Sequence, residues 1–204
     1  MPLPPPAPRQ RKHTRRIVIE GFHRDDGLWD IEAHITDEKT RDFPLASGVR
    51  PVGQPVHDMR LRLTIDETLT VLDAEAVSDA VPYPGQCETI APAYRQLIGL
   101  NLLRGFRKAV QERLGKAAGC THMTELATVL PTAAIQTFAG EVFKSSNSAD
   151  AESTTKPFQI DGCHALRSDG EAVRIYYPRW YVGADEDDAS SKKDSSKKAI
   201  HENS

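Results

Sequence analysis

A thiol and an imidazole lie two residues apart in GCTHMTEL, residues 119–126. The apolar pattern that follows predicts a helix from Thr121, with the Thr121 hydroxyl at the N-cap. Cys120 would then precede the helix, where the positive end of the helix dipole stabilises a thiolate. In mid-helix these side chains would diverge, but at a helix start Cys120 and His122 can reach one point. The alternative is a small buried cysteine beside a capped helix.

Two further donors come from other parts of the chain. His57 begins HDMRLRLTI, whose alternation places His57 on the core side of a strand and Asp58 on the solvent side. Cys87 lies in the loop between the strands and the helices. If the helices pack on the sheet, four side chains can meet at one end of this layer: His57, Cys87, Cys120 and His122.

Two thiolates and two imidazoles are suitable ligands for zinc or for an iron–sulfur cluster. The spacing is not that of a zinc finger, because the sequence has no Cys-x-x-Cys knuckle. Glu125, one turn beyond His122, and Asp58 are candidate carboxylates for orienting the ligands. Cys163, followed by His164, is a candidate substitute for one ligand. The alternative for all these residues is a packed core without metal, and the sequence identifies no catalytic residue.

Two hairpin patterns precede the helices. In the first, IVIEGF and LWDIEAHI flank Asp26-Gly27, a pair typical of tight turns. Its second strand places a set of apolar side chains on one face: Trp29, Ile31, Ala33 and Ile35. The second hairpin consists of HDMRLRLTI and a return strand from about Leu69 to Val77, whose inward face is ambiguous. A proline-containing loop joins the two hairpins.

Helical spacing follows the second hairpin. Its first apolar face contains Leu103, Phe106, Val110 and Leu114. A second helix is predicted from about Thr121 to Val142, which crosses or kinks at Pro131 or is divided there. Strand patterns followed by helical patterns predict an α+β fold. We therefore expect an antiparallel sheet of two hairpins with helices between Leu102 and Val142 on one face.

The ends of the chain and one internal stretch are polar or proline-rich, which is typical of disorder. The sequence predicts a disordered proline-rich and basic N-terminus at 1–14 and an α+β domain at 15–143. It further predicts a flexible linker at 144–156, a C-terminal docking segment at 157–183 and a disordered tail at 184–204.

Composition excludes several classes of function. The net charge of -3 argues against nucleic-acid binding, which requires a basic surface. No apolar run approaches the roughly 20 residues of a membrane span, and the basic start lacks the apolar segment of a secretory signal. Three widely spaced cysteines do not indicate a disulfide framework. We therefore expect a bacterial-type cytoplasmic protein with reduced thiols and with neither nucleic-acid nor membrane partners.

Several motifs together resemble one uncharacterised bacterial family. In chain order they are HTRRI, GLWDIEAHITD, HDMRLRLTID, DAEA, APAYRQLIGL, GCTHMTEL and DGCHALRSDGEAVRIYYPRW. They resemble the family catalogued as domain of unknown function two-eight-eight-nine, from His13 to Trp180. The agreement of separate motifs in order makes the resemblance specific, but it implies no activity.

A second resemblance covers roughly Val56 to Ala139. A hairpin, a cysteine loop and a helix that opens on a His-Cys pair are similar to those of U-type iron–sulfur scaffold proteins. The resemblance implies that Cys87, Cys120 and His122 take ligand positions. The sequence departs from the family in having His57 in place of a cysteine and the order Cys-x-His. A histidine makes the site less anionic, which suits zinc or a more oxidising cluster.

These observations lead to several hypotheses about function. The first is an accessory or carrier protein that binds a metal ion or iron–sulfur cluster, with a protein partner. A zinc-dependent enzyme would use Glu125 or Asp58 as the base, and a thiol enzyme would use Cys120 as nucleophile and His122 as base. The remaining alternative is an interaction module without metal whose contact surface is YYPRWY. The sequence leaves the substrate, the metal and the oligomeric state open.

Overall fold

The structure is a computed structural model, and it describes residues 3–143 and 156–183. It divides the chain into two units, Met1–Phe143 and Lys144–Ser204. The predicted tail and all of the predicted linker except Lys156 lie outside the described residues. Within the described residues, no helix has the length and apolar character needed to cross a membrane.

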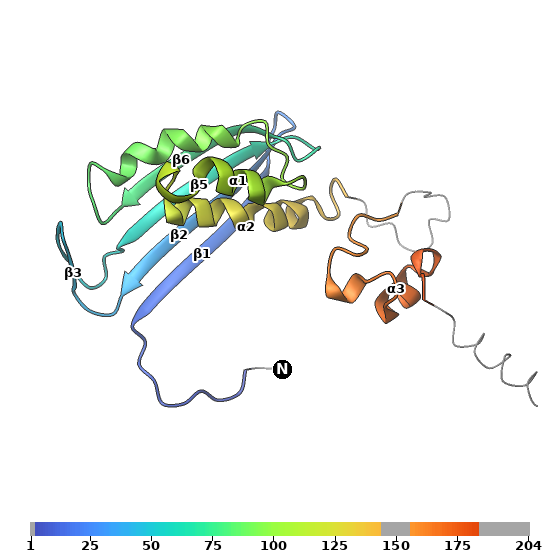
Figure 1. The fold of residues 1–204 in the computed structure, drawn as a ribbon, viewed down its shortest axis with the longest axis horizontal. Helices are drawn as coiled ribbons and strands as arrows, with labels where there is room; N and C mark the ends of the chain where they lie inside the picture. The colour runs from blue at the N-terminus through green and yellow to red at the C-terminus, as the bar shows by residue number, and fades with distance from the viewer. Residues whose placement is uncertain (1–2, 144–155, 184–204) are drawn as a thin grey trace, which may run out of the picture. The chain divides into compact units, whose positions relative to one another are not determined.

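The N-terminal unit is built on a four-stranded antiparallel sheet with the order β1-β2-β5-β6 (Figure 1). The strands are β1 (His13–His23), β2 (Trp29–Lys39), β5 (His57–Ile65) and β6 (Val71–Ala80). The first hairpin turns at Gly27, whose φ of 81° is a conformation that glycine adopts without steric cost. The predicted α+β fold, with two antiparallel hairpins in one sheet, is confirmed.

Helices cover one face of this sheet, which we call the inner face (Figure 1). They are the 3-10 helices η1 (Cys87–Leu97) and η2 (Lys116–Ala118) and the α-helices α1 (Phe106–Leu114) and α2 (Thr121–Phe138). α2 packs on β1, β2 and β5, η1 packs on β6, and α1 packs on α2. The hydrophobic core lies between the helices and the inner face.

Alternation along the two central strands fills the core. On β2 the predicted inward residues are all buried: Trp29, Ile31, Ala33 and Ile35. β5 adds a matching set on the same face: Met59, Leu61, Leu63 and Ile65. These two rows oppose one another in the antiparallel register. A single-residue slip would move each row to the other face, so burial fixes the register.

β6 departs from simple alternation, which explains why its inward face is ambiguous in the sequence. The pairing with β5 shifts between Thr64 and Ile65. Because of this irregularity, both Val71 and Ala74 are buried although they are three residues apart. The strand also starts later and ends later than the predicted range of Leu69 to Val77.

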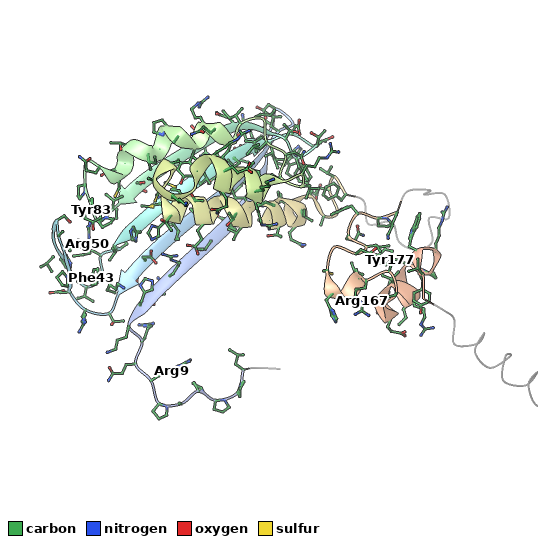
Figure 2. All side chains as sticks on the ribbon, in the orientation of Figure 1. Arg9, Phe43, Arg50, Tyr83, Arg167 and Tyr177 are labelled. Carbon is green, nitrogen blue, oxygen red and sulfur yellow. The ribbon has the colours of Figure 1, made fainter. Side chains whose placement is uncertain are left out.

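Two regions predicted as loops contain regular structure. A two-stranded sheet, β3 (Phe43–Leu45) and β4 (Gly48–Arg50), lies between the hairpins. Arg50 Nη2 donates a hydrogen bond of 2.9 Å to the carbonyl of Val81, which ties this small sheet to the segment containing Tyr83 (Figure 2). The second region is η1, whose short 3-10 turns do not produce the 3.6-residue period of an α-helix.

The helical predictions need two corrections, at Leu103 and at the end of α2, and the structure selects one of the alternatives at Pro131. Leu103 is 45% exposed and lies before α1, so Leu102 is the buried residue there. α2 continues through Pro131, because buried side chains on both sides of the proline hold the helix against the core. α2 ends at Phe138 rather than Val142, and Gly140 follows with a φ of 87°, which favours glycine and stops the helix.

The C-terminal unit contains short helices only within residues 156–183: η3 (His164–Leu166), α3 (Glu171–Tyr176) and η4 (Pro178–Trp180). Ile160 and Val173 are its buried apolar residues. Docking of this segment remains a prediction.

The close approach of β1 to α2 gives a test of the packing. A Cβ added at Gly21 would overlap the side chain of Thr137. We expect Gly21→Ala to lower the free energy of unfolding by about 1–3 kcal/mol, the usual cost of overpacking. Urea denaturation of Gly21→Ala and of Gly21→Ala/Thr137→Ala would measure it, and the second substitution should recover part of the loss. Equal stability of Gly21→Ala and the wild type would contradict this packing.

Candidate metal centre

Three strands place polar side chains in one row at the end of the inner face. Arg15 of β1 pairs with Asp37 of β2, and Asp37 pairs with His57 of β5. Each residue continues the inward alternation of its strand. His57 follows the parity of Met59, as predicted, and Asp37 follows that of Ile35. The apolar inner face therefore ends in a row of an arginine, a carboxylate and a histidine.

The Asp37 carboxylate is the centre of this row, and its side chain is only 3% exposed. Arg15 donates from Nε to Oδ1 and from Nη2 to Oδ2, both at 2.8 Å. His57 Nδ1 lies 3.0 Å from Oδ2, and His13 Nε2 lies 3.0 Å from Oδ1. A buried carboxylate requires such partners because charge is costly to remove from water.

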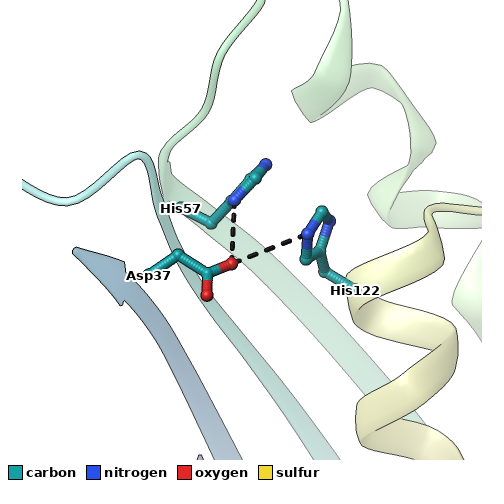
Figure 3. A group of neighbouring side chains, drawn as sticks. All are labelled: Asp37, His57 and His122. Atoms are coloured by element: carbon teal, nitrogen blue, oxygen red, sulfur yellow. Dashed lines mark hydrogen bonds and ion pairs between the residues drawn. The ribbon is translucent and has the colours of Figure 1, made fainter. Parts of the chain in front are cut away.

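α2 brings a second imidazole to the same oxygen (Figure 3). His122 Nε2 lies 3.6 Å from Asp37 Oδ2, and the rings of His57 and His122 have centroids 3.7 Å apart. One donor atom from each of Asp37, His57 and His122 lies within 4.8 Å of the other two. This cluster could hold a metal ion.

The start of α2 is fixed by a buried tyrosine on η1. Tyr94 Oη donates to the carbonyl of Cys120 at 2.9 Å and accepts from the Cys120 N–H at 3.0 Å. Cys120 occupies the N-cap position predicted for Thr121, which is the first residue of the helix. Because Tyr94 holds this turn, His122 is presented toward the sheet.

The environment keeps Asp37 ionised. Burial by itself raises the pKa of Asp37, but the hydrogen bonds and charge of Arg15 outweigh burial, with the charges that His57 and His122 carry once they are protonated, and lower this pKa to about 2. Asp37 is therefore a carboxylate throughout the physiological pH range.

The same environment keeps both imidazoles neutral. Burial lowers the pKa of His57, the charge of His122 adds to this effect, and Asp37 opposes it. Burial also lowers the pKa of His122, and the charge of Arg15 adds to it. Neutral imidazole is the form that binds metal ions.

Cys120 and Glu125 border this cluster without contributing its three donor atoms. Cys120 Sγ lies 4.0 Å from His122 Nδ1, whereas the other ring nitrogen faces Asp37. Glu125 forms an ion pair with Arg15, whose Nη1 lies 2.6 Å from Oε2. Glu125 thus acts on the cluster through Arg15, and through its charge, which opposes the lowering of the His122 pKa, rather than through a bond to His122.

The other predicted residues lie elsewhere. Cys87 is the first residue of η1 and packs, partly buried, against the hydrophobic core. Asp58 is on the outer face of the sheet, where its Oδ1 lies 2.6 Å from His34 Nε2. Cys163 belongs to the C-terminal unit and is exposed. In the part of the chain that the structure describes, only Asp37, His57 and His122 form a group of this type.

Sequence reasoning missed Asp37 and Arg15. Asp37 lies two residues beyond Ile35, so the alternation that identifies the inward residues of β2 also predicts an inward carboxylate. A charged residue on an apolar face is informative because ionised side chains are rarely buried without a partner. Arg15 gives a weaker signal, since its partner becomes evident only from the register of β1 and β2.

The fold and the cluster define a small α+β protein with a histidine–aspartate group at one end of its sheet. The chain belongs to the family described as "Protein of unknown function (DUF2889)", whose model matches residues 13–136. The match includes every residue of the cluster and supports the first of the two resemblances. No finding supports the resemblance to U-type scaffold proteins. The searches of curated proteins and of solved structures found no match.

The lowered histidine pKa values predict an acid-sensitive cluster. Below pH 6.5, His57 and His122 become protonated in the unfolded chain, whereas in the folded metal-free protein they stay neutral to lower pH. The stability from these groups is therefore present above pH 6.5 and is lost as pH falls through their folded pKa values. We expect chelator-treated protein to lose stability from pH 7 to 5 in urea titrations.

A double variant provides the control for this prediction. His57→Asn/His122→Asn removes both titrations and should make stability flatter over that range. The contribution of Asp37 is lost only at lower pH, between its ordinary value of 3.8 and its folded value of about 2. Identical pH profiles for wild type and double variant would contradict the lowered pKa values.

Proposed function

We propose that the protein binds one divalent transition-metal ion, with zinc as the preferred ion, through Asp37, His57 and His122, and acts as an accessory or carrier protein. The observation that supports this proposal is the convergence of three donor atoms within 4.8 Å from two strands and a helix. Two imidazoles and one carboxylate form a ligand set common in zinc sites with three protein ligands.

The spacing of the donors suits zinc. Bonds of about 2.0–2.2 Å in a tetrahedral site separate neighbouring ligand atoms by roughly 3.3–3.6 Å. Asp37 Oδ2 lies 3.0 Å from His57 Nδ1 and 3.6 Å from His122 Nε2, so small side-chain rotations would admit the ion.

The charges of the surroundings also suit a dication. Asp37 and Glu125 are paired with the single guanidinium of Arg15. With the imidazoles of His57 and His122 neutral, these two carboxylates and one guanidinium leave an excess negative charge before the ion binds, and His13 at Asp37 Oδ1 offsets it only when protonated. Glu125 therefore offsets the repulsion that Arg15 would exert on a metal ion.

The donor set predicted from the sequence shares His57 and His122 with this group but takes Cys87 and Cys120 in place of Asp37. That set suits an iron–sulfur cluster better, because thiolates hold such clusters. Cys120 faces the His122 nitrogen that is turned from Asp37, so we assign it the orienting contact to that nitrogen. Zinc is therefore the preferred ion.

The incomplete coordination and partial solvent exposure of the three ligands support a carrier function. Three protein ligands leave a fourth position for water or for a donor from a partner. His57 and His122 are 14% and 22% exposed, so a bound ion would be accessible from solvent. A closed structural site would instead be completed by a fourth protein ligand. The proposal includes the cytoplasmic location and the protein partner expected from the sequence.

Elemental analysis of anaerobically purified full-length protein tests metal binding. We expect about one zinc per chain, because zinc sites with these ligands bind tightly at neutral pH. His57→Ala and His122→Ala should each lower the metal content at least about tenfold. His23→Ala, which changes an exposed histidine stacked on Trp29, is the matched control and should keep its metal.

Three further variants test whether Asp37 or the cysteines bind the metal together with His57 and His122. Asp37→Asn should lose zinc, whereas Cys87→Ser and Cys120→Ser should retain it. If the wild type instead contains iron and sulfide, and both are lost in the cysteine variants, the site binds an iron–sulfur cluster through the cysteine-containing set rather than zinc. Metal-free wild type after supplementation with zinc and with iron would overturn the proposal and leave the interaction module as the explanation.

A further inference from the structure

β1 is an edge strand that is long and partly apolar, which is unusual for the edge of a sheet. Within residues 3–143 it pairs only with β2, so its other side carries unpaired backbone donors and acceptors (Figure 1). The opposite edge differs, because Val71 of β6 exchanges hydrogen bonds with Gly99 and Leu100. An unpaired edge is a template for another strand unless it is blocked.

β1 lacks several of the features that block such pairing. The strand has 11 residues, has no proline and is regularly paired with β2 throughout. Apolar side chains are exposed along it, with Ile17 at 36%, Val18 at 50% and Phe22 at 45%. Proteins normally protect edges with prolines, bulges, short strands or charged side chains, and of these β1 has only the charges of Arg15, Arg16 and Glu20. A long, regular and partly apolar edge therefore indicates that another strand covers it.

One charge on β1 lacks a partner within the described residues. Glu20 lies directly opposite Glu32 of β2, an arrangement of like charges that destabilises a sheet. Glu32 is compensated by Arg62 Nε at 2.7 Å, but Glu20 forms no ion pair with any described residue. Arg16, on the same face of the strand, pairs with Glu38 at 2.8 Å and is still more than half exposed.

We propose that two copies of the chain associate through antiparallel pairing of their β1 strands, with Val18 of both copies on the twofold axis. In this register Arg16 of each copy lies opposite Glu20 of the other. Each of the two Glu20 side chains therefore gains an arginine as its counter-charge. Ile17 of each copy lies opposite Ile19 of the other on the inner face. The strand is therefore self-complementary, as a twofold interface requires.

The neighbouring registers fit less well. A continuous sheet with the helices of both copies on one face allows shifts only in steps that preserve the alternation of side chains. Centring the pair on Ile17 places Arg16 opposite Val18 and Thr14 opposite Glu20. Centring it on Ile19 places Val18 opposite Glu20 and Arg16 opposite Phe22. Only the register centred on Val18 opposes the charges of Arg16 and Glu20.

The expected assembly is a dimer of about 45 kDa, twice the 22.5 kDa of one chain, measurable by sedimentation of the full-length protein over a concentration series. Arg16→Glu places two glutamates opposite each other at both symmetric positions, and Glu20→Arg places two arginines there. Each single variant should raise the dimer dissociation constant about tenfold or more.

Exchanging the charges of Arg16 and Glu20 tests whether these two residues oppose each other in the dimer. The double variant Arg16→Glu/Glu20→Arg restores opposite charges and should dimerise again. A mixture of the two single variants should form heterodimers, because one contributes two glutamates and the other two arginines. Lys108→Glu on α1, at an 82% exposed side chain, is the control and should leave dimerisation unchanged.

Each outcome decides the proposal. Heterodimers from variants that are monomeric alone show that both are folded and that the strands pair in this register. A monomeric wild type at all concentrations would overturn the proposal. Dimers that persist unchanged in both single variants would do so as well, because the interface would then lie elsewhere.

Discussion

The bidentate pair of Arg15 and Asp37 is the interaction on which the rest of the candidate centre depends. It places a carboxylate at the end of an apolar row, where an isolated charge would be costly. Its two hydrogen bonds of 2.8 Å neutralise that charge and hold the carboxylate in one orientation. The Asp37 carbonyl also accepts a 2.7 Å hydrogen bond from the Val56 N–H, which guides the chain into β5 immediately before His57.

From this pair, the positions of the histidines follow. His57 is directly across from Asp37 in the β2–β5 register, so its ring can reach the carboxylate without help from a loop. His122 depends on the helix layer, because Tyr94 holds the first turn of α2 and the buried side chains of α2 press it on the sheet. The sheet therefore supplies the anion and one imidazole, and the helix supplies the other.

The fold was predictable because it depends on local patterns. Alternation in LWDIEAHI and HDMRLRLTI identifies the inward rows, and the apolar spacing from Phe106 onward is that of a helix. The pairing irregularity of β6, the passage of α2 through Pro131 and the short turns of η1 depend on tertiary contacts, which override local preference. The periodicity of the sequence therefore does not identify these features.

The candidate centre was only partly predictable, for a related reason. Strand parity and a helix start suffice to bring His57 and His122 to one end of the sheet. Asp37 obeys the same parity, but carboxylates on strands usually face water, and its partner Arg15 is 22 residues away. Cysteines attract attention because of their chemistry, yet Cys87 contacts the core, and Cys120 lies beside the far nitrogen of His122.

Arg15 has opposing effects on a metal ion, and these explain the rest of the arrangement. Its charge helps to keep Asp37 ionised and His122 neutral, which are the protonation states that ligands require. The same charge repels a dication. Glu125 reduces this repulsion from the helix side by pairing with Arg15 Nη1, while Nε and Nη2 remain on Asp37. An arginine bound by two carboxylates can thus prepare the ligands and still leave the site attractive to a cation.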